Sequence, residues 1–363
     1  MSETRHNWTK EEILEIYHTP LMELLYKAAT IHREHHDPNT VQVSTLLSIK
    51  TGGCPEDCGY CPQAARYHTD IKGNDLMSVQ QVKAQALRAK SSGSSRVCMG
   101  AAWRNVKDGP EFDNVLEMVR TINKLDMEVC CTLGMVTETQ AQRLAEAGLY
   151  AYNHNLDTSE DYYKDVISTR AYEDRLDTIS NVRKTNVTVC SGGIIGMGEA
   201  IEDRAGMLVA LATLDPQPES TPINALVAVP GTPMEEIEPI TIWEMIRMVA
   251  TTRIVMPLTQ VRLSAGRTEM SREGQAMCFF AGANSIFAGD KLLTTPNPDV
   301  NEDMKMFDLL GLTPMKPFVK KAQPATVEAV DSQMDALGEK PKWSRPGHKI
   351  ERNETAKAMA KNK

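Results

Sequence analysis

The sequence lacks the features that mark membrane proteins and proteins with a broad nucleic-acid-binding surface. No apolar run approaches the roughly 18 residues that cross a bilayer, and the first residues lack the apolar core of a signal peptide. With 40 Lys and Arg against 48 Asp and Glu, the net charge of −8 argues against nonspecific attraction to nucleic acid or an anionic membrane. We therefore expect a cytoplasmic protein that binds neither.

A dinucleotide-binding turn is also missing, because no GxGxxG follows the first β-branched run. This absence argues against an open, doubly wound sheet.

Aromatic residues make up only 5% of the 363 residues, whereas 41% are hydrophobic, which is enough for one large core or two ordinary ones.

Short β-branched runs alternate with longer amphipathic stretches along the chain. Eight such strand–helix pairs predict an α/β fold, a (β/α)8 TIM-type barrel. We expect strands near residues 42–49, 96–100, 128–133, 150–155, 188–192, 223–229, 260–264 and 284–288. We expect helices near residues 78–90, 111–125, 138–147, 172–184, 203–214, 241–253, 271–282 and 301–310.

Two segments flank the predicted barrel, which we place at residues 41–320. Residues 1–40 are predicted to form a helical lead-in, in which Thr9 and Glu12 have the spacing of a capping box. Residues 321–363 form a C-terminal extension whose basic end, 339–363, we expect to be disordered. That end is either a solvated tail or a docking arm for an acidic partner.

The eight cysteines of a protein in a reducing compartment point to metal or redox chemistry before disulfides. Cys54, Cys58 and Cys61 form a CxxxCxxC motif directly after the first predicted strand. Neighbouring glycines and prolines keep this segment in a loop, so that the thiolates can converge on one centre. A loop that follows a barrel strand lies at the catalytic face.

Two kinds of metal centre fit the motif. A zinc ion needs a fourth ligand, for which His68 is available. An iron–sulfur cluster held by three cysteines instead leaves one iron open to a substrate or cofactor. The position of the loop at the catalytic face favours the cluster.

Side chains alternate between the two faces of a strand, and this alternation sorts the remaining cysteines. It predicts that Cys98, Cys130 and Cys190 face the barrel interior and that Cys131 faces the helices. Each could also be a small buried hydrophobe, as we expect for Cys278 on a helix.

The same alternation turns Arg262 inward on the seventh predicted strand. A buried guanidinium requires an anionic partner or a polar cavity, because removing its charge from water is costly. A cluster with thiolate ligands would be such a partner, and Arg262 would either donate a hydrogen bond to it or ligate it.

Polar residues gather where the predicted strands end. Asn153, Asn155 and Asp157 share one face after the fourth strand, and Asn224 enters the sixth. Amides and a carboxylate there suit the hydroxyl, ureido or ribose groups of a small ligand, although Asp157 could instead cap the next helix. The glycine-rich turn 191–199 allows a ligand or a neighbouring backbone to approach closely.

The cysteine motif, with Tyr60 before its last cysteine, resembles that of the radical S-adenosylmethionine (SAM) enzymes. Among these enzymes the chain is similar to the biotin synthase family over about residues 40–312. The similarity rests on VCMGAAWR at 97–104, TLG at 132–134, YNHNLDT at 152–158, CSGG at 190–193, VRLSAGR at 261–267, AGANSI at 281–286 and KLLTTPNP at 291–298.

The resemblance implies two iron–sulfur clusters and two small-molecule sites. The cluster ligands would be Cys54, Cys58 and Cys61 for a [4Fe-4S] cluster that binds SAM, and Cys98, Cys130, Cys190 and Arg262 for a [2Fe-2S] cluster deeper in the barrel. The contacts to SAM would come from Asn155, Asp157, Gly192, Gly193 and Glu199, with Asp157 at the ribose, and those to dethiobiotin from Asn153, Asn155 and Asn224.

The implied reaction is insertion of sulfur into dethiobiotin to form biotin, which makes the chain a sulfurtransferase. A radical derived from SAM would abstract hydrogen, and the [2Fe-2S] cluster would donate sulfur. The resemblance further implies a reduced flavodoxin or ferredoxin-type electron donor and a homodimer. Two alternatives remain, a radical SAM barrel enzyme with a different second site, such as a hydrogenase-cofactor maturase, and a zinc-stabilised binding barrel.

Overall fold

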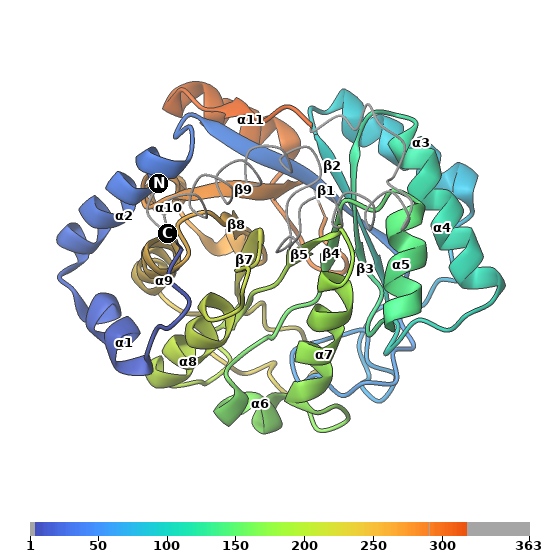
Figure 1. Cartoon of the computed structure of the whole chain (residues 1–363), viewed down its shortest axis with the longest axis horizontal. Coiled ribbons are helices and arrows are strands. Elements are labelled where there is room, and N and C mark those ends of the chain that lie inside the picture. The colour runs from blue at the N-terminus through green and yellow to red at the C-terminus, as the bar shows by residue number, and fades with distance from the viewer. Residues whose placement is uncertain (1–3, 290, 318–363) are drawn as a thin grey trace, which may run out of the picture.

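The computed structural model describes residues 4–289 and 291–317 of the chain. Among these residues, eight parallel strands pair in the order β1-β2-β3-β4-β5-β7-β8-β9, and β9 pairs with β1 to close the ring (Figure 1). The predicted (β/α)8 barrel is therefore confirmed. The extension expected at 321–363 lies outside the described residues.

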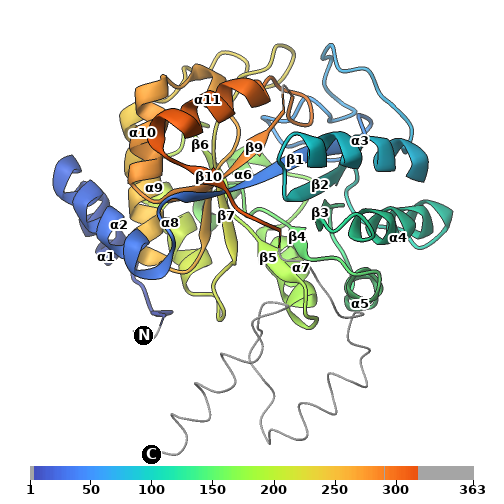
Figure 2. The ribbon, with the colours of Figure 1, turned by 90° about the horizontal axis from the view of Figure 1, so that it is seen from above.

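The strands are short and the helices lie around them (Figures 1 and 2). The strands are β1 (Thr40–Lys50), β2 (Arg96–Ala101), β3 (Glu128–Thr132), β4 (Ala151–Asn153), β5 (Thr188–Cys190), β6 (Gly193–Ile195), β7 (Ser220–Ala225), β8 (Gln260–Leu263), β9 (Ala283–Ala288) and β10 (Thr313–Pro314). The helices are α1 (Lys10–His18), α2 (Leu21–His35), α3 (Val79–Ser91), α4 (Pro110–Asn123), α5 (Glu138–Glu146), α6 (Glu160–Val166), α7 (Tyr172–Arg183), α8 (Ile201–Ala212), α9 (Ile242–Val255), α10 (Arg272–Phe280) and α11 (Val300–Leu310), with a 3-10 turn η1 (Arg267–Glu269). In the part of the chain that is described, no helix is both long and apolar enough to cross a membrane.

The two N-terminal helices pack outside the barrel, where α1 contacts α8 and α2 contacts α9. The capping box predicted at the start of α1 is confirmed, because the Glu12 N–H donates to Thr9 Oγ1 at 3.2 Å and the Thr9 N–H donates to Glu12 Oε2 at 3.0 Å. These helices therefore add a partial second layer to one side of the ring.

The structure departs from the predicted elements mainly around β7. The sixth barrel strand was expected at 223–229 but covers Ser220–Ala225, and its partner is split into β5 and β6. Cys190 pairs with Ser220 and Gly193 with Ile223, so the split lies next to Pro222. Proline has no N–H to donate, which explains why the ladder is interrupted there.

Four short elements were not predicted: α6, β6, β10 and η1. The α6 sequence spans only seven residues, too few for a helical period to be recognised, and the Ser159 hydroxyl caps it by accepting from the Tyr162 N–H at 3.1 Å. Tertiary packing, rather than periodicity, decides such short elements.

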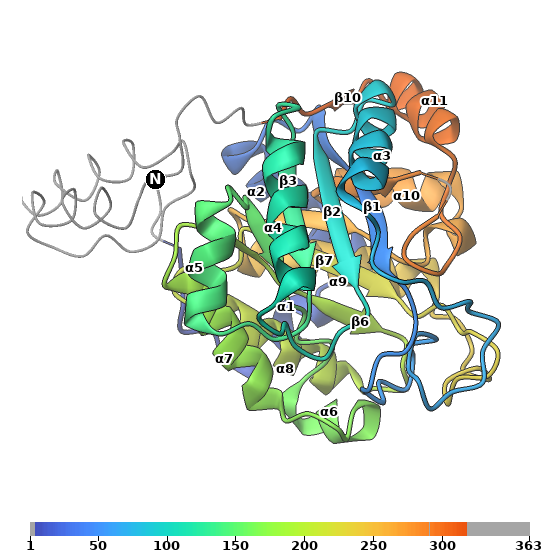
Figure 3. The same cartoon turned by 90° about the vertical axis from the view of Figure 1, so that its right-hand side faces the viewer.

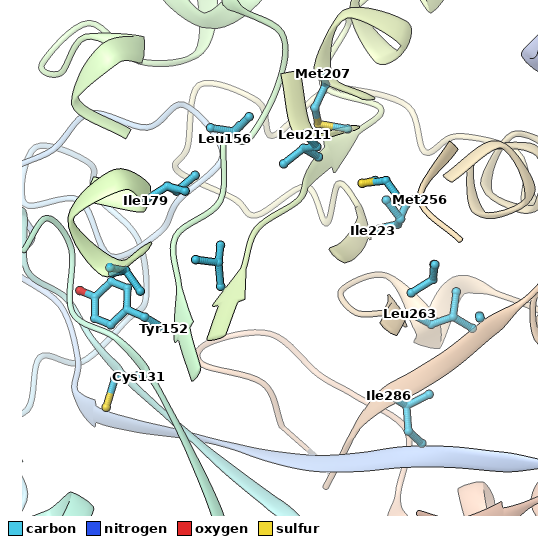
Figure 4. Packing of buried hydrophobic residues seen from close by; sticks show 14 of the residues in the cluster. Cys131, Tyr152, Leu156, Ile179, Met207, Leu211, Ile223, Met256, Leu263 and Ile286 are labelled. Carbon is cyan, nitrogen blue, oxygen red and sulfur yellow. The ribbon is translucent and has the colours of Figure 1, made fainter. Parts of the chain in front are cut away.

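Alternate strand residues pack outward against the helices, as the pattern predicts. In Figure 4, Cys131 of β3 lies beside Tyr152 of β4, and the two residues are paired in the sheet register. Both belong to the large buried apolar cluster, whereas Cys98 and Cys130 belong to a separate inner cluster with Phe287. The predicted strand parity at Cys130 and Cys131 is therefore confirmed.

A buried ion pair fastens η1 to the last described helix. The Arg267 and Asp303 side chains are 0% and 1% exposed, and Arg267 also donates to Phe287 O at 2.9 Å. Arg267→Met should lower the free energy of unfolding by about 3–5 kcal/mol, because it leaves the Asp303 charge buried without a partner. Urea denaturation followed by circular dichroism measures this loss.

Arg272→Met is the matched control, because Arg272 at the start of α10 also pairs with a carboxylate of α11, that of Glu302, but its side chain is 68% exposed. This variant should leave the unfolding midpoint almost unchanged, since exposed pairs contribute little. Equal losses in the two variants would contradict the importance assigned to burial.

Candidate active site

The cysteine loop follows β1 at the carboxyl ends of the strands, as Figure 3 shows. Backbone hydrogen bonds close the loop on itself: the Cys54 N–H donates to Gln63 O at 3.0 Å, and the Cys61 N–H donates to Cys58 O at 2.9 Å. The loop thus holds its three cysteines at the catalytic face of the barrel, where the motif predicted them.

Asp57 ties this loop to the segment that joins α6 to α7. Its carboxylate accepts hydrogen bonds from the Ser168 N–H at 2.9 Å and the Thr169 N–H at 3.1 Å. These bonds to the ionised form outweigh the effect of burial and lower the pKa of Asp57 to about 2. The segment 168–170 is consequently held against the cysteine motif.

Burial raises the pKa of all three motif thiols, to about 12 for Cys58 and about 11 for Cys61. The Cys61 thiol interacts electrostatically with both Cys54 and Cys58. Thiols in such surroundings remain protonated until a metal replaces the proton. The donor set therefore suits a metal centre better than a free nucleophile.

A cavity of about 320 Å³ joins the two groups of cysteines. Residues predicted for the site that line it are Cys54, Cys61, Cys98, Cys130, Asn153, Asn155, Asp157, Asn224 and Arg262. Cys58, Cys190, Gly192, Gly193, Glu199 and the candidate zinc ligand His68 are not among its lining residues. Among residues 4–289 and 291–317, no three His, Cys, Asp or Glu side chains are placed to hold one metal ion.

Cys98 and Cys130 are paired in register across β2 and β3 and are both buried. Burial opposes ionisation of Cys98, but the hydrogen bond with Cys130 and the charges of Arg262 and Arg96 lower its pKa to about 7. The pKa of Cys130 is raised by that same bond and by burial. The two thiols therefore lie side by side inside the barrel, near the positive charges of Arg262 and Arg96.

Arg262 lines the same cavity as Cys98 and Cys130, and the groups to which it donates hydrogen bonds are neutral. Its guanidinium donates to Ser285 Oγ at 2.9 Å, to Gln42 Oε1 at 3.0 Å and to Cys190 Sγ at 3.5 Å. It also lies over the Phe287 ring, 4.7 Å from the centroid. These contacts bring Cys190 and Arg262 together and leave the positive charge available to an anionic ligand.

The asparagines at the barrel mouth bond to the surrounding strands. Asn153 Nδ2 donates to Asn155 Oδ1 at 3.1 Å and to Cys190 Sγ at 3.2 Å. Asn224 Nδ2 donates to Gly193 O at 2.9 Å, and its Oδ1 accepts from the Ala265 N–H at 3.1 Å. Their orientation is thus fixed by the protein while they line the cavity.

Asp157 is the centre of a buried polar group. Its carboxylate accepts from the Tyr60 hydroxyl at 2.9 Å and pairs with Arg175, which also donates to Asn155 O at 2.7 Å. Asp157 adopts a left-handed backbone conformation with φ of 68°. It does not cap α6, whose cap is Ser159.

The glycine-rich turn fits the alternative in which a neighbouring backbone comes close. A Cβ on Gly192 would lie 2.0 Å from Pro222 O, and one on Gly193 would lie 2.5 Å from Asp157 O. Glu199 holds the same turn, because its carboxylate accepts from the Gly196 and Met197 N–H groups at 2.8 and 2.6 Å. Ile194 is the member of this turn that lines the cavity.

Several residues that line the cavity were not predicted as site residues, among them Trp103, Arg170, Arg175 and Thr294. Arg170 lies in the loop that leads into α7, and Arg175 lies in α7 itself. Neither is on a strand, so strand alternation could not predict the direction of its side chain. Their proximity to the cysteine motif, far away in sequence, was the signal that sequence alone could not provide.

A closed parallel barrel with a CxxxCxxC loop at its carboxyl-terminal face, beside a cavity lined by cysteines, asparagines and arginines, defines an enzyme of the radical SAM superfamily. In agreement, residues 48–211 match the model of the Radical SAM superfamily, and residues 222–313 match that of the Biotin and Thiamin Synthesis associated domain. The chain belongs to the biotin synthase family and is a sulfurtransferase.

Its membership rests on full-length relatives. The chain is 83% identical to the biotin synthase of Flavobacterium psychrophilum over 362 residues, covering 100% of each chain. It is 84% identical to that of Flavobacterium johnsoniae over 358 residues, covering 99% of each. It is 57% identical to that of Nostoc punctiforme over 330 residues, covering 89% of this chain and 98% of the relative.

Solved structures agree on the fold. A methylornithine synthase matches with a TM-score of 0.71 and 16% identity, covering 85% of this chain and 94% of its own. The FeFe-hydrogenase maturase of Carboxydothermus hydrogenoformans matches with a TM-score of 0.72 and 16% identity, covering 92% and 82%. At this level of identity the likeness supports the barrel architecture alone.

Proposed function

We propose that this enzyme inserts sulfur into dethiobiotin to form biotin, using a [4Fe-4S] cluster at Cys54, Cys58 and Cys61 and a [2Fe-2S] cluster at Cys98, Cys130, Cys190 and Arg262. The single observation that carries the proposal is one cavity lined by both groups of cysteines. It gives a small substrate access to both proposed centres.

The donor sets suit these groups. The loop supplies three cysteines, so a four-iron cluster bound by them would keep one iron open. The inner set combines buried thiols with a guanidinium whose contacts are neutral, so an anionic cluster would satisfy its charge. When bound, the clusters and SAM supply the radical and the sulfur that the reaction needs.

The chain's own residues would orient the reactants and exclude water. Asn155 and Asp157 would hold SAM, with Asp157 at the ribose, and Gly192, Gly193 and Glu199 of the glycine-rich turn would help to seat it. Asn153, Asn155 and Asn224 offer amide groups in the cavity for the ureido ring of dethiobiotin. The buried, largely apolar walls would exclude other hydrogen donors.

The enzyme should draw electrons from a reduced flavodoxin or ferredoxin-type donor and work as a cytoplasmic homodimer. Its chain should comprise a helical lead-in at 1–40, the barrel at 41–320 and a C-terminal extension at 321–363. These points form part of the proposal and rest on the family resemblance. Analytical ultracentrifugation tests the dimer, and activity with each purified donor tests the electron source.

Iron and sulfide analysis with Mössbauer spectra of anaerobically reconstituted protein tests the proposed function. A four-iron cluster perturbed by SAM, a separate two-iron cluster and biotin formed from dethiobiotin are the expected results. A four-iron cluster alone would remove the proposed sulfur donor and favour another radical SAM reaction. Colourless protein with bound zinc would support the binding barrel.

Helix α1 is connected through Arg204 to Glu199, one of the residues that we propose to seat SAM. Arg204 donates to the Tyr17 hydroxyl at 3.1 Å and to Glu199 Oε1 at 2.7 Å. Tyr17→Phe should therefore raise the Kd for SAM by about threefold, since part of a charged hydrogen bond worth roughly 1.5–3 kcal/mol is lost. Calorimetric titration of reconstituted protein with SAM measures it.

Tyr26→Phe is the control for this prediction, because Tyr26 lies on α2 and its side chain is exposed. It should leave SAM affinity unchanged. A Tyr17→Phe variant with the parental Kd would show that the N-terminal helices only stabilise the barrel.

A further inference from the structure

Arg170 has an unusual environment for a buried cation. Its side chain is only 7% exposed, yet its Nε has no hydrogen-bond partner among the described residues. Its nearest carboxylate oxygen, Glu56 Oε1, lies 3.6 Å from Nε, beyond hydrogen-bond distance. Because a buried N–H of a guanidinium without an acceptor is costly, this arrangement points to a further anionic partner beside Glu56.

The neighbouring cations are better satisfied. Arg175 pairs with Asp157 and donates to Asn155 O and the Tyr163 hydroxyl, both at 2.7 Å. Arg104 approaches Glu56 Oε1 at 3.2 Å. Arg104 and Arg170 therefore share one carboxylate, and the three groups together carry a net positive charge.

Arg170 lines the same cavity as Cys54. The Ser168 and Thr169 N–H groups donate to the Asp57 carboxylate and hold the segment of Arg170 against the cysteine loop. The Arg170 side chain is thus held beside the cysteine loop, in a cavity that two of the three proposed cluster ligands, Cys54 and Cys61, also line.

We propose that Arg170 donates hydrogen bonds to the anionic four-iron cluster held by Cys54, Cys58 and Cys61 and raises its reduction potential. This inference rests on the proposed function. A positive charge and N–H donors beside the sulfurs stabilise the reduced cluster, which carries one more negative charge. Arg170 would thereby make electron entry from the donor easier.

The test is a redox titration of the four-iron cluster, followed by electron paramagnetic resonance, in anaerobically reconstituted full-length protein without SAM. Arg170→Met should make reduction at least tenfold less favourable, a shift of about 59 mV to more negative potential for a one-electron couple. Arg170→Lys should keep most of the parental potential because it retains the charge. Arg170→Gln serves as a second neutral variant if the Met variant does not take up iron.

Arg66→Met is the matched control, because Arg66 belongs to the cysteine loop itself and pairs with Asp57 at 3.5 Å, but its side chain is 52% exposed and is not among the cavity-lining residues. Its potential should equal that of the parent. Unchanged potentials in both neutral Arg170 variants would overturn the inference. If these variants also bound SAM more weakly, Arg170 would be assigned to the SAM carboxylate instead. If the parent itself holds no four-iron cluster, the proposed function fails.

Discussion

Replacing Cys61 with alanine is expected to abolish the four-iron cluster and, with it, SAM cleavage and biotin formation, to background levels. Cys61 lines the cavity and interacts electrostatically with both other motif thiols. Two thiolates cannot hold the three irons that a site-differentiated cluster presents to the protein. Iron content, the visible absorption of the reconstituted protein and the yield of 5′-deoxyadenosine measure the loss.

Cys278→Ala is the control for this variant. Cys278 is fully buried in α10, belongs to the apolar core and does not line the described cavity. Its truncation should cost about 1 kcal/mol of stability while iron binding and SAM cleavage persist. A Cys61→Ala protein that still cleaves SAM at the parental rate would contradict the assignment of the motif.

The second large effect is expected at Cys130. Cys130→Ala should abolish the two-iron cluster and biotin formation while SAM cleavage continues. Cys130 lies on β3 beside Cys98, among the proposed ligands of the two-iron cluster, and not in the motif loop. Mössbauer spectra count the remaining clusters, and product analysis separates 5′-deoxyadenosine from biotin.

The adjacent cysteine provides the comparison. Cys131 faces the helices in the outer apolar cluster and belongs to the same strand, so Cys131→Ala should keep both clusters and biotin formation. Burial raises the pKa of its thiol, as expected of a core cysteine. If Cys131→Ala lost the two-iron cluster and Cys130→Ala kept it, the ligand would be Cys131 and the proposed assignment to Cys130 would be wrong.

The sequence alone determined the barrel and the orientation of its cysteines. Strand alternation is a local property with a period of two, so the opposite directions of Cys130 and Cys131 could be derived from neighbouring residues. The glycines and prolines around Cys54 made the motif a loop, and its place after β1 put it at the catalytic face. Whether these cysteines bind the proposed clusters stays a prediction.

Only the tertiary structure decided which groups meet across the barrel. Arg170 approaches Glu56 and Tyr17 reaches Glu199 through Arg204, although each pair is far apart in sequence and belongs to no common period. Pro222 divided the strand beside it, and the glycines at 192 and 193 accommodate backbone and side chains from other elements. Such contacts depend on how loops and helices pack around the closed barrel. The hydrophobic pattern of neighbouring residues in the sequence does not predict that packing.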